Sequence, residues 1–127
     1  MLRVLLVEDE EDQRNLYKDS FLEAGFEVQT ARNGTEALTI FKANQPDAVV
    51  LDIQMPGMDG IEALEKILAK DKNIVVLFYS AYSTFKSNFM TWAADAFVMK
   101  TGDPSEIVNE VRRLLAERGM IPVHHVE

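Results

Sequence analysis

The chain has no cysteine, no long apolar run and an excess of acidic over basic residues. Without cysteine it has neither disulfides nor thiol chemistry, which fits a reducing compartment and leads us to expect a cytoplasmic location. No apolar stretch approaches the roughly 20 residues of a membrane-spanning helix, so we expect no membrane span. The 13 basic and 21 acidic residues give a net charge of −8. This balance argues against direct nucleic-acid binding, which depends on clustered Lys and Arg.

What the chain does have is a regular alternation of short apolar runs and helical patterns. Five runs have the length and composition of β-strands: Leu2–Val7, Glu27–Thr30, Ala48–Leu51, Ile74–Tyr79 and Ala96–Met99. Three of them are continuously apolar, as parallel strands buried on both faces should be. The alternation predicts an α/β fold with a doubly wound parallel sheet and helices on both faces. We expect one domain over residues 1–119, followed by a tail or the start of a linker over residues 120–127.

Several helical segments have recognisable end signals. Gly25 follows the first segment as a left-handed stop. Asn33 and Glu36 have the spacing of a capping box at the start of the second. At the last helix, we expect Asp103 to be the cap and Pro104 to be the first helical residue.

Polar side chains occur at or just after four of the five predicted strands. Glu8 and Asp9 follow the first strand, Asp52 the third, Ser80 the fourth and Lys100 the fifth. Parallel strands of a doubly wound sheet present their carboxyl ends at one edge, so these residues should converge there. Three neighbouring carboxylates repel one another unless a cation neutralises them, and oxygen ligands of this kind suit Mg²⁺. Asp52 could then act as a nucleophile toward a phosphoryl donor, with Lys100 and Ser80 contacting the phosphoryl oxygens.

Each of these residues also has a simpler structural explanation. The acidic run that begins at Glu8 could be a solvated helix start favoured by the helix dipole, and Asp52 could cap a helix or a turn. Ser80 could be a turn residue and Lys100 a surface charge. Their joint occurrence at four strand ends favours a shared site.

Four segments resemble the receiver domain of two-component response regulators: LLVEDE at residues 5–10, VLDIQMPGMDG at 50–60, YSA at 79–81 and AFVMK at 96–100. The similarity extends from about residue 2 to about residue 117. It implies a flavodoxin-like five-stranded sheet with the strand order 2-1-3-4-5. It also implies phosphorylation by a sensor histidine kinase or a phosphotransfer protein, with Mg²⁺, or Mn²⁺ in its place, as the cofactor. The domain would catalyse only its own phosphorylation and dephosphorylation.

The resemblance also implies a role for each matching residue. Asp52 would be the phosphoacceptor, and Glu8 and Asp9 the acid pair that binds the metal together with Asp52. The other implied roles are the backbone carbonyl of Gln54 as a metal ligand, Ser80 as the switch hydroxyl, Phe97 as the switch aromatic residue and Lys100 as the partner of the phosphoryl group. Gln54 and Tyr82 flank the acceptor and should influence how fast water removes the phosphoryl group.

One departure from the family pattern follows the lysine, where Thr101 replaces a common proline in a cis peptide. A cis bond before Thr would cost about 3–4 kcal/mol, so we expect a trans bond. A second departure is the aromatic-rich helix expected over Ser83–Ala93, in which Met90 and Trp92 could form a patch for an output partner. Homodimerisation through the last strand and its flanking helices is an alternative to a monomer.

Two other functions compete with a phosphorylation-controlled module. One is a receiver-like interaction domain whose output does not depend on phosphorylation. The other is a phosphohydrolase with an aspartyl nucleophile, which would need a general acid at position 54, where Gln54 cannot donate a proton to a leaving group. Neither a G-x-G-x-x-G nor a Walker-type loop follows the first strand, which argues against dinucleotide or flavin binding.

Overall fold

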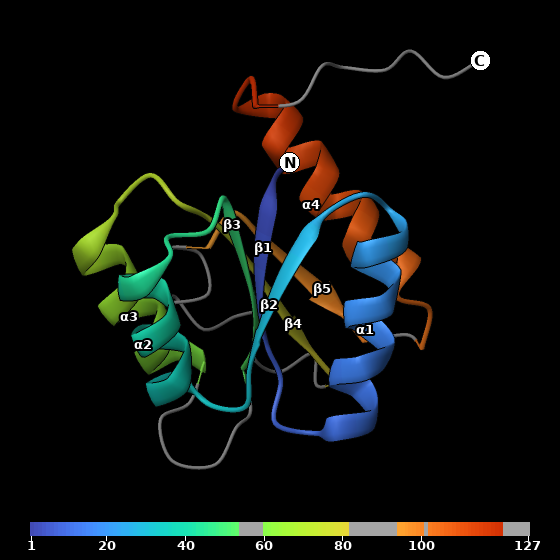
Figure 1. Ribbon diagram of the computed structural model, residues 1–127, viewed down its shortest axis with the longest axis horizontal. Helices are drawn as coiled ribbons and strands as arrows, with labels where there is room; N and C mark the ends of the chain where they lie inside the picture. Colours follow the sequence, from blue (N-terminus) through green and yellow to red (C-terminus); the bar gives the residue numbers. More distant parts are fainter. Residues whose placement is uncertain (54–59, 82–93, 101, 121–127) are drawn as a thin grey trace.

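The computed structural model describes residues 1–53, 60–81, 94–100 and 102–120. They contain a five-stranded sheet with the order β2-β1-β3-β4-β5, in which every neighbouring pair is parallel (Figure 1). The strands are β1 (Arg3–Val7), β2 (Glu27–Ala31), β3 (Ala48–Asp52), β4 (Val75–Ser80) and β5 (Ala96–Met99). The predicted α/β fold and the strand order implied by the resemblance are therefore confirmed.

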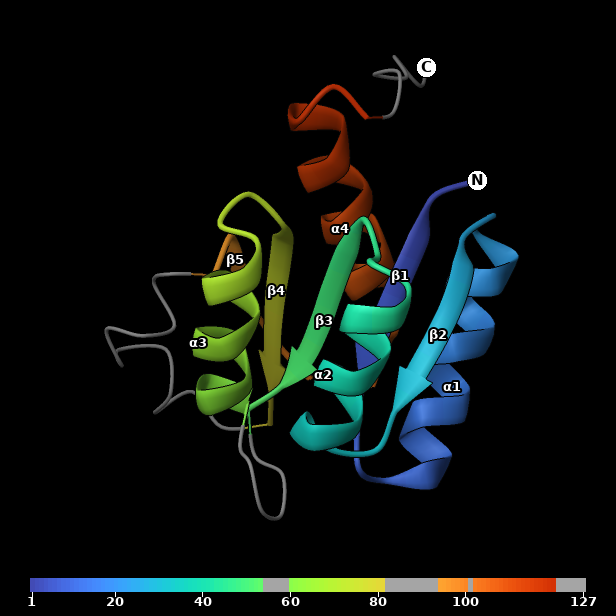
Figure 2. The ribbon, with the colours of Figure 1, turned by 60° about the vertical axis from the view of Figure 1, so that its left-hand side comes forward.

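Helices cover both faces of the sheet. On one face lie α1 (Glu11–Glu23) and α4 (Ser105–Glu117), and on the other α2 (Gly34–Ala43) and α3 (Gly60–Lys70) (Figures 1 and 2). None of these described helices is long and apolar enough to span a bilayer. The helix expected over Ser83–Ala93 lies outside the described residues, as does the predicted tail beyond Met120.

The sheet divides the apolar core into two layers. Along β1, Val4 and Leu6 face α1 and α4, whereas Leu5 and Val7 face α2 and α3, and all four are fully buried. This follows from the period of two along a strand, which sends successive side chains to opposite faces. Burial on both faces explains why the central strands read as continuous apolar runs in the sequence.

Three strands, β2, β3 and β4, end one residue later than the sequence predicts, and the last residues of β3 and β4 are polar. Asp52 is the last residue of β3 and is paired with Tyr79, and Ser80 is the last residue of β4 and is paired with Met99. Their backbones belong to the hydrogen-bonded sheet. Both polar side chains are therefore held on rigid strand ends.

The structure contains the predicted stop signal at the end of α1 and part of the predicted capping box at the start of α2. Gly25 has a φ of +94°, in the left-handed region that stops α1 as predicted. At the start of α2, Asn33 Oδ1 accepts the amide of Glu36 at 2.8 Å. The Glu36 carboxylate accepts the amide of Arg32, one residue before the expected donor, so the capping box is only half formed.

The start of α4 corrects a prediction by one residue. The helix begins at Ser105 and not at Pro104, although Pro104 has helical dihedral angles. Proline has no amide hydrogen, so the first amide available to a cap is that of Ser105. Asp103 Oδ1 accepts this amide at 3.0 Å, but the N-cap position is Pro104 and not Asp103 as predicted.

Candidate functional site

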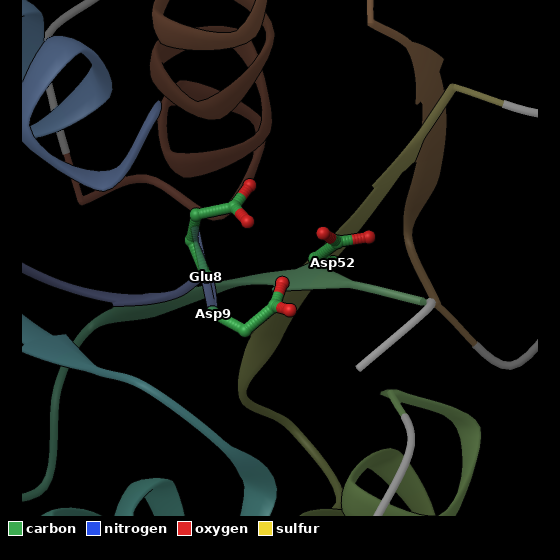
Figure 3. Close-up of side chains that lie close together, drawn as sticks. All are labelled: Glu8, Asp9 and Asp52. Atoms are coloured by element: carbon green, nitrogen blue, oxygen red, sulfur yellow. The ribbon is translucent and has the colours of Figure 1, made fainter. Parts of the chain in front are cut away.

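Three carboxylates meet at the carboxyl edge of β1 and β3. Glu8 and Asp9 follow β1, and Asp52 ends β3 (Figure 3). One oxygen from each residue lies within 4.8 Å of the others. Glu8 and Asp52 are buried, whereas Asp9 is exposed to solvent. The structure thus brings together the acidic residues that the sequence places at this edge.

Lys100 binds two of these carboxylates from the end of β5. Its Nζ lies 2.9 Å from Glu8 Oε1 and 3.0 Å from Asp52 Oδ2. A third hydrogen bond, of 2.8 Å, goes to Gln13 Oε1 on α1. An ammonium group has three hydrogens, so these contacts use its full donor capacity. Burial by itself would lower the pKa of Lys100, but Glu8 and Asp52 outweigh burial and raise it, so the ammonium stays charged.

Glu8 has donors on both carboxylate oxygens. Oε1 accepts from Lys100 and from the Tyr79 hydroxyl at 2.8 Å, and Oε2 accepts from the amide of Glu10 at 3.0 Å. Burial acts to raise the pKa of Glu8, yet the amide of Glu10, Lys100 and Tyr79 together lower it. Glu8 is therefore a fully buried carboxylate that remains ionised because its neighbours donate to it.

Only three residues, Glu8 to Glu10, separate the end of β1 from the start of α1. Glu10 is the N-cap of α1, and its side chain accepts the amides of Asp12 and Gln13. A carboxylate suits this position because it satisfies free amides at the positive end of the helix dipole. The cap fixes the start of α1 and so places Gln13 beside Lys100.

Asp9 has the opposite electrostatic environment from Glu8. Partial burial and the neighbouring Glu8 carboxylate raise the pKa of Asp9. The side chain is exposed and lies close to the other two carboxylates, so like charges are near one another on the solvent-exposed side of the site. The three carboxylates carry more negative charge than Lys100 offsets, and such a cluster of hard oxygen donors fits a divalent cation such as Mg²⁺.

Two other predicted site residues are described by the structure. Ser80 is buried at the end of β4, and its carbonyl oxygen accepts the amide of Lys100 at 2.8 Å. Phe97 is half-buried in β5 on the α2–α3 face, where it pairs in register with Phe78. Gln54, Tyr82 and Thr101 lie outside the described residues. Their expected contributions therefore stay predictions.

The start of α3 is packed directly against the strand end that bears Asp52. The amide of Gly60 donates to the carbonyl of Ile53 at 2.9 Å. A Cβ atom at Gly60 would overlap the carbonyl oxygen of Asp52 and lie 2.7 Å from Cα of Ile53. Backbone atoms in a packed core do not give way easily, so this position needs a residue without a side chain.

Sequence reasoning missed two residues of the site, Gln13 and Tyr79. Gln13 lies on the first turns of α1, and Tyr79 belongs to the apolar run Ile74–Tyr79. One signal was available for Tyr79, since a buried tyrosine hydroxyl usually finds a hydrogen-bond partner and this one directly precedes Ser80. No local signal distinguishes Gln13 from other polar residues on the first turns of a helix.

Comparison with known proteins places this arrangement in a family. The sequence matches the response regulator receiver domain over residues 4–112. It is 37% identical over 119 residues to the transcriptional regulatory protein PrrA of Mycobacterium tuberculosis. The match covers 92% of this chain and 51% of PrrA, so the chain spans about half the length of that relative.

Solved structures of one response regulator match the fold of this chain over most of the chain's length. The response regulator protein TrrA of Thermotoga maritima, in complex with Mg²⁺ and BeF, has a TM-score of 0.87 and 41% identity and covers 91% of this chain and 100% of its own. TrrA in complex with the histidine kinase ThkA has a TM-score of 0.84 and 41% identity and covers 91% of this chain and 99% of the matched one. The family match runs from β1 into α4, and the chain therefore belongs to the receiver domain family of two-component response regulators.

Proposed function

We propose that this chain is a phosphoacceptor module and that Asp52 receives the phosphoryl group in a reaction that requires Mg²⁺. The observation that carries the proposal is the position of the Asp52 carboxylate, 3.0 Å from Lys100 Nζ and clustered with Glu8 and Asp9. Solved complexes of TrrA with Mg²⁺ and BeF, and with a histidine kinase, support the same chemistry by similarity.

The side chains of the site divide the work of phosphoryl transfer. An oxygen of Asp52 forms a bond to phosphorus while the bond between phosphorus and the donor atom breaks, and the donor leaves with the electron pair. Lys100 is the cation next to Asp52 and stabilises the negative charge on the phosphoryl oxygens. Ser80, buried at the end of the neighbouring strand, donates its hydroxyl to another of these oxygens.

Glu8, Asp9 and Asp52 would hold the metal ion, with the backbone carbonyl of Gln54 as a further ligand. Mg²⁺ would supply positive charge that offsets the carboxylates and the phosphoryl oxygens. Mn²⁺ would substitute for it, since carboxylate, carbonyl and water oxygens suit both ions.

Phosphorylation of Asp52 would change the surface that a partner recognises. It adds about −1 to −2 units of charge at a buried strand end. Ser80 moves toward the phosphoryl group, and Phe97, half-buried on the adjacent strand, turns inward. To move the population from 1:99 to 99:1, the phosphoryl group must favour the active form by roughly 5.5 kcal/mol.

The proposed partners are a sensor histidine kinase or a phosphotransfer protein as donor and an output protein or domain as receiver of the signal. Residues 1–119 would form the signalling domain in the cytoplasm, and residues 120–127 would lead away from it. Apart from its own phosphorylation and dephosphorylation, the domain would catalyse no reaction. Gln54 and Tyr82 would set the rate at which water attacks the phosphorylated Asp52.

Incubation with Mg²⁺ and acetyl phosphate, followed by intact mass spectrometry, tests the proposal. We expect a single labile phosphate adduct on the wild-type chain, and none on Asp52→Asn or after removal of the metal with EDTA. Asp19→Asn is the matched control, because Asp19 is an exposed aspartate on α1 and should not affect the adduct. An adduct that survives Asp52→Asn, or a wild-type chain that takes up no phosphate, would refute the assignment.

A further inference from the structure

Tyr79 is a buried titratable residue that the proposed chemistry does not use. It is fully buried on the α1–α4 face of β4, next to Ser80 and paired in register with Asp52. Its hydroxyl donates to Glu8 Oε1 at 2.8 Å. Burial, and then the nearby Glu8 carboxylate, raises the pKa of Tyr79 well above its usual range, so the phenol keeps its proton and remains a donor.

The ring of Tyr79 is also in contact with the cation of the site. Lys100 Nζ lies 4.8 Å from the centre of the ring, within the range of a cation–π contact. Tyr17 of α1 also packs edge-on against the ring, with centroids 5.3 Å apart. The ring is thus in contact with both α1 and the lysine, and its hydroxyl is hydrogen-bonded to Glu8.

We propose that Tyr79 is a positioning residue, which orients the Glu8 carboxylate for binding of the divalent cation. The inference rests on the proposed function, because it assumes that Glu8 takes part in the metal site. Glu8 is fully buried, so the direction of its lone pairs depends entirely on the donors around it. Within the described ranges, the hydroxyl of Tyr79 is one of two side-chain donors to Oε1, the other being Lys100.

The role of Tyr79 becomes larger when Asp52 is phosphorylated. Lys100 Nζ is shared among Glu8, Asp52 and Gln13, and a move of this ammonium toward the phosphoryl oxygens would weaken its hydrogen bond to Glu8 Oε1. Among the described residues, the Tyr79 hydroxyl is the other side-chain donor to this oxygen. The Tyr79 hydroxyl therefore keeps Glu8 Oε1 hydrogen-bonded both before and after phosphorylation. A buried charged oxygen without a hydrogen-bond donor would destabilise the protein.

Tyr79→Phe tests the inference because it removes the hydroxyl and keeps the ring that contacts Tyr17 and Lys100. Titration calorimetry of the metal-free full chain with MgCl₂ gives the dissociation constant for Mg²⁺. Loss of a hydrogen-bond partner behind a metal ligand typically weakens metal binding about 10- to 100-fold, and we expect about 10-fold here. Tyr17→Phe is the matched control, since no hydrogen bond joins the Tyr17 hydroxyl to the described part of the chain, and it should change the constant less than about twofold.

A double-mutant cycle separates positioning through Glu8 from a general effect on packing. In the Glu8→Gln background the carboxylate is already gone, so adding Tyr79→Phe should weaken Mg²⁺ binding by less than about twofold further. An equal loss of Mg²⁺ affinity in both backgrounds would overturn the inference and leave the proposed metal site intact. A Tyr79→Phe variant that binds Mg²⁺ as well as the wild type would do the same. A wild-type chain that binds no Mg²⁺ would overturn the proposed metal site, and the inference with it.

Discussion

Replacement of Lys100 by methionine should destabilise the metal-free protein strongly. The ammonium of Lys100 is the cation between two buried carboxylates, with side-chain exposures of 1% for Glu8 and 6% for Asp52. Methionine has nearly the same length and fills the same space, so the change removes the charge with little change in packing. What remains is a pair of buried carboxylates without the positive charge of Lys100.

The expected size of the effect follows from this burial. Removal of one partner of a buried ion pair typically costs about 3–5 kcal/mol. Lys100 is 13% exposed and water can reach part of the site, so we expect a value near the lower limit, about 3 kcal/mol. With an unfolding entropy of about 2.1 cal/mol/K per residue over 127 residues, this lowers Tm by roughly 11 °C.

Urea unfolding in EDTA at neutral pH measures the change, with Lys72→Met as the control. Lys72 is exposed and has no ion pair among the described residues, so this variant should stay within about 0.5 kcal/mol of the wild type. Addition of Mg²⁺ at 100 times its dissociation constant should raise the free energy of unfolding of Lys100→Met by about 2.7 kcal/mol. A Lys100→Met variant within about 1 kcal/mol of the wild type in EDTA would refute the account, because the carboxylates would then need no counter-ion.

Three further predictions concern the same edge of the sheet. Gly60→Ala should lower the free energy of unfolding by about 1–3 kcal/mol in urea titrations, because its Cβ would overlap the carbonyl of Asp52; a neutral effect would contradict the close packing. Asp9→Asn should raise the free energy of unfolding of the metal-free protein by a few tenths of a kcal/mol in urea titrations, since partial burial and the neighbouring Glu8 carboxylate both raise the pKa of Asp9 and so disfavour its charged form; an unchanged or lower free energy of unfolding would argue against it. The pKa of Glu8 is lowered on folding, so its ionised form stabilises the protein above its usual pKa of 4.5, and this contribution is lost as the pH falls through the lower folded value. The difference in unfolding free energy between wild type and Glu8→Gln should therefore narrow below about pH 4.5, and a gap that stays constant down to pH 3 would refute this.

The features that the sequence predicted well depend on local rules. Continuous apolar runs identify strands buried on both faces, and a glycine after a helical stripe identifies a left-handed stop, as at Gly25. The convergence of Glu8, Asp9 and Asp52 could be predicted because parallel strands share one carboxyl edge. The helix start at Pro104 was wrong by one residue, because cap positions depend on which amide is available.

The order of the elements, the faces of the strands and the set of polar residues at their ends could be predicted from the sequence, because each depends on neighbours along the chain. Which partners those side chains have depends on the tertiary packing. Tyr79 reaches Glu8 across 71 residues, and Lys100 reaches Gln13 across 87. No period or motif in the sequence encodes such pairs, since they depend on how β4, β5 and α1 pack. The packing of these three elements turns a cluster of acidic residues into a site with a fixed lysine and an oriented Glu8 carboxylate.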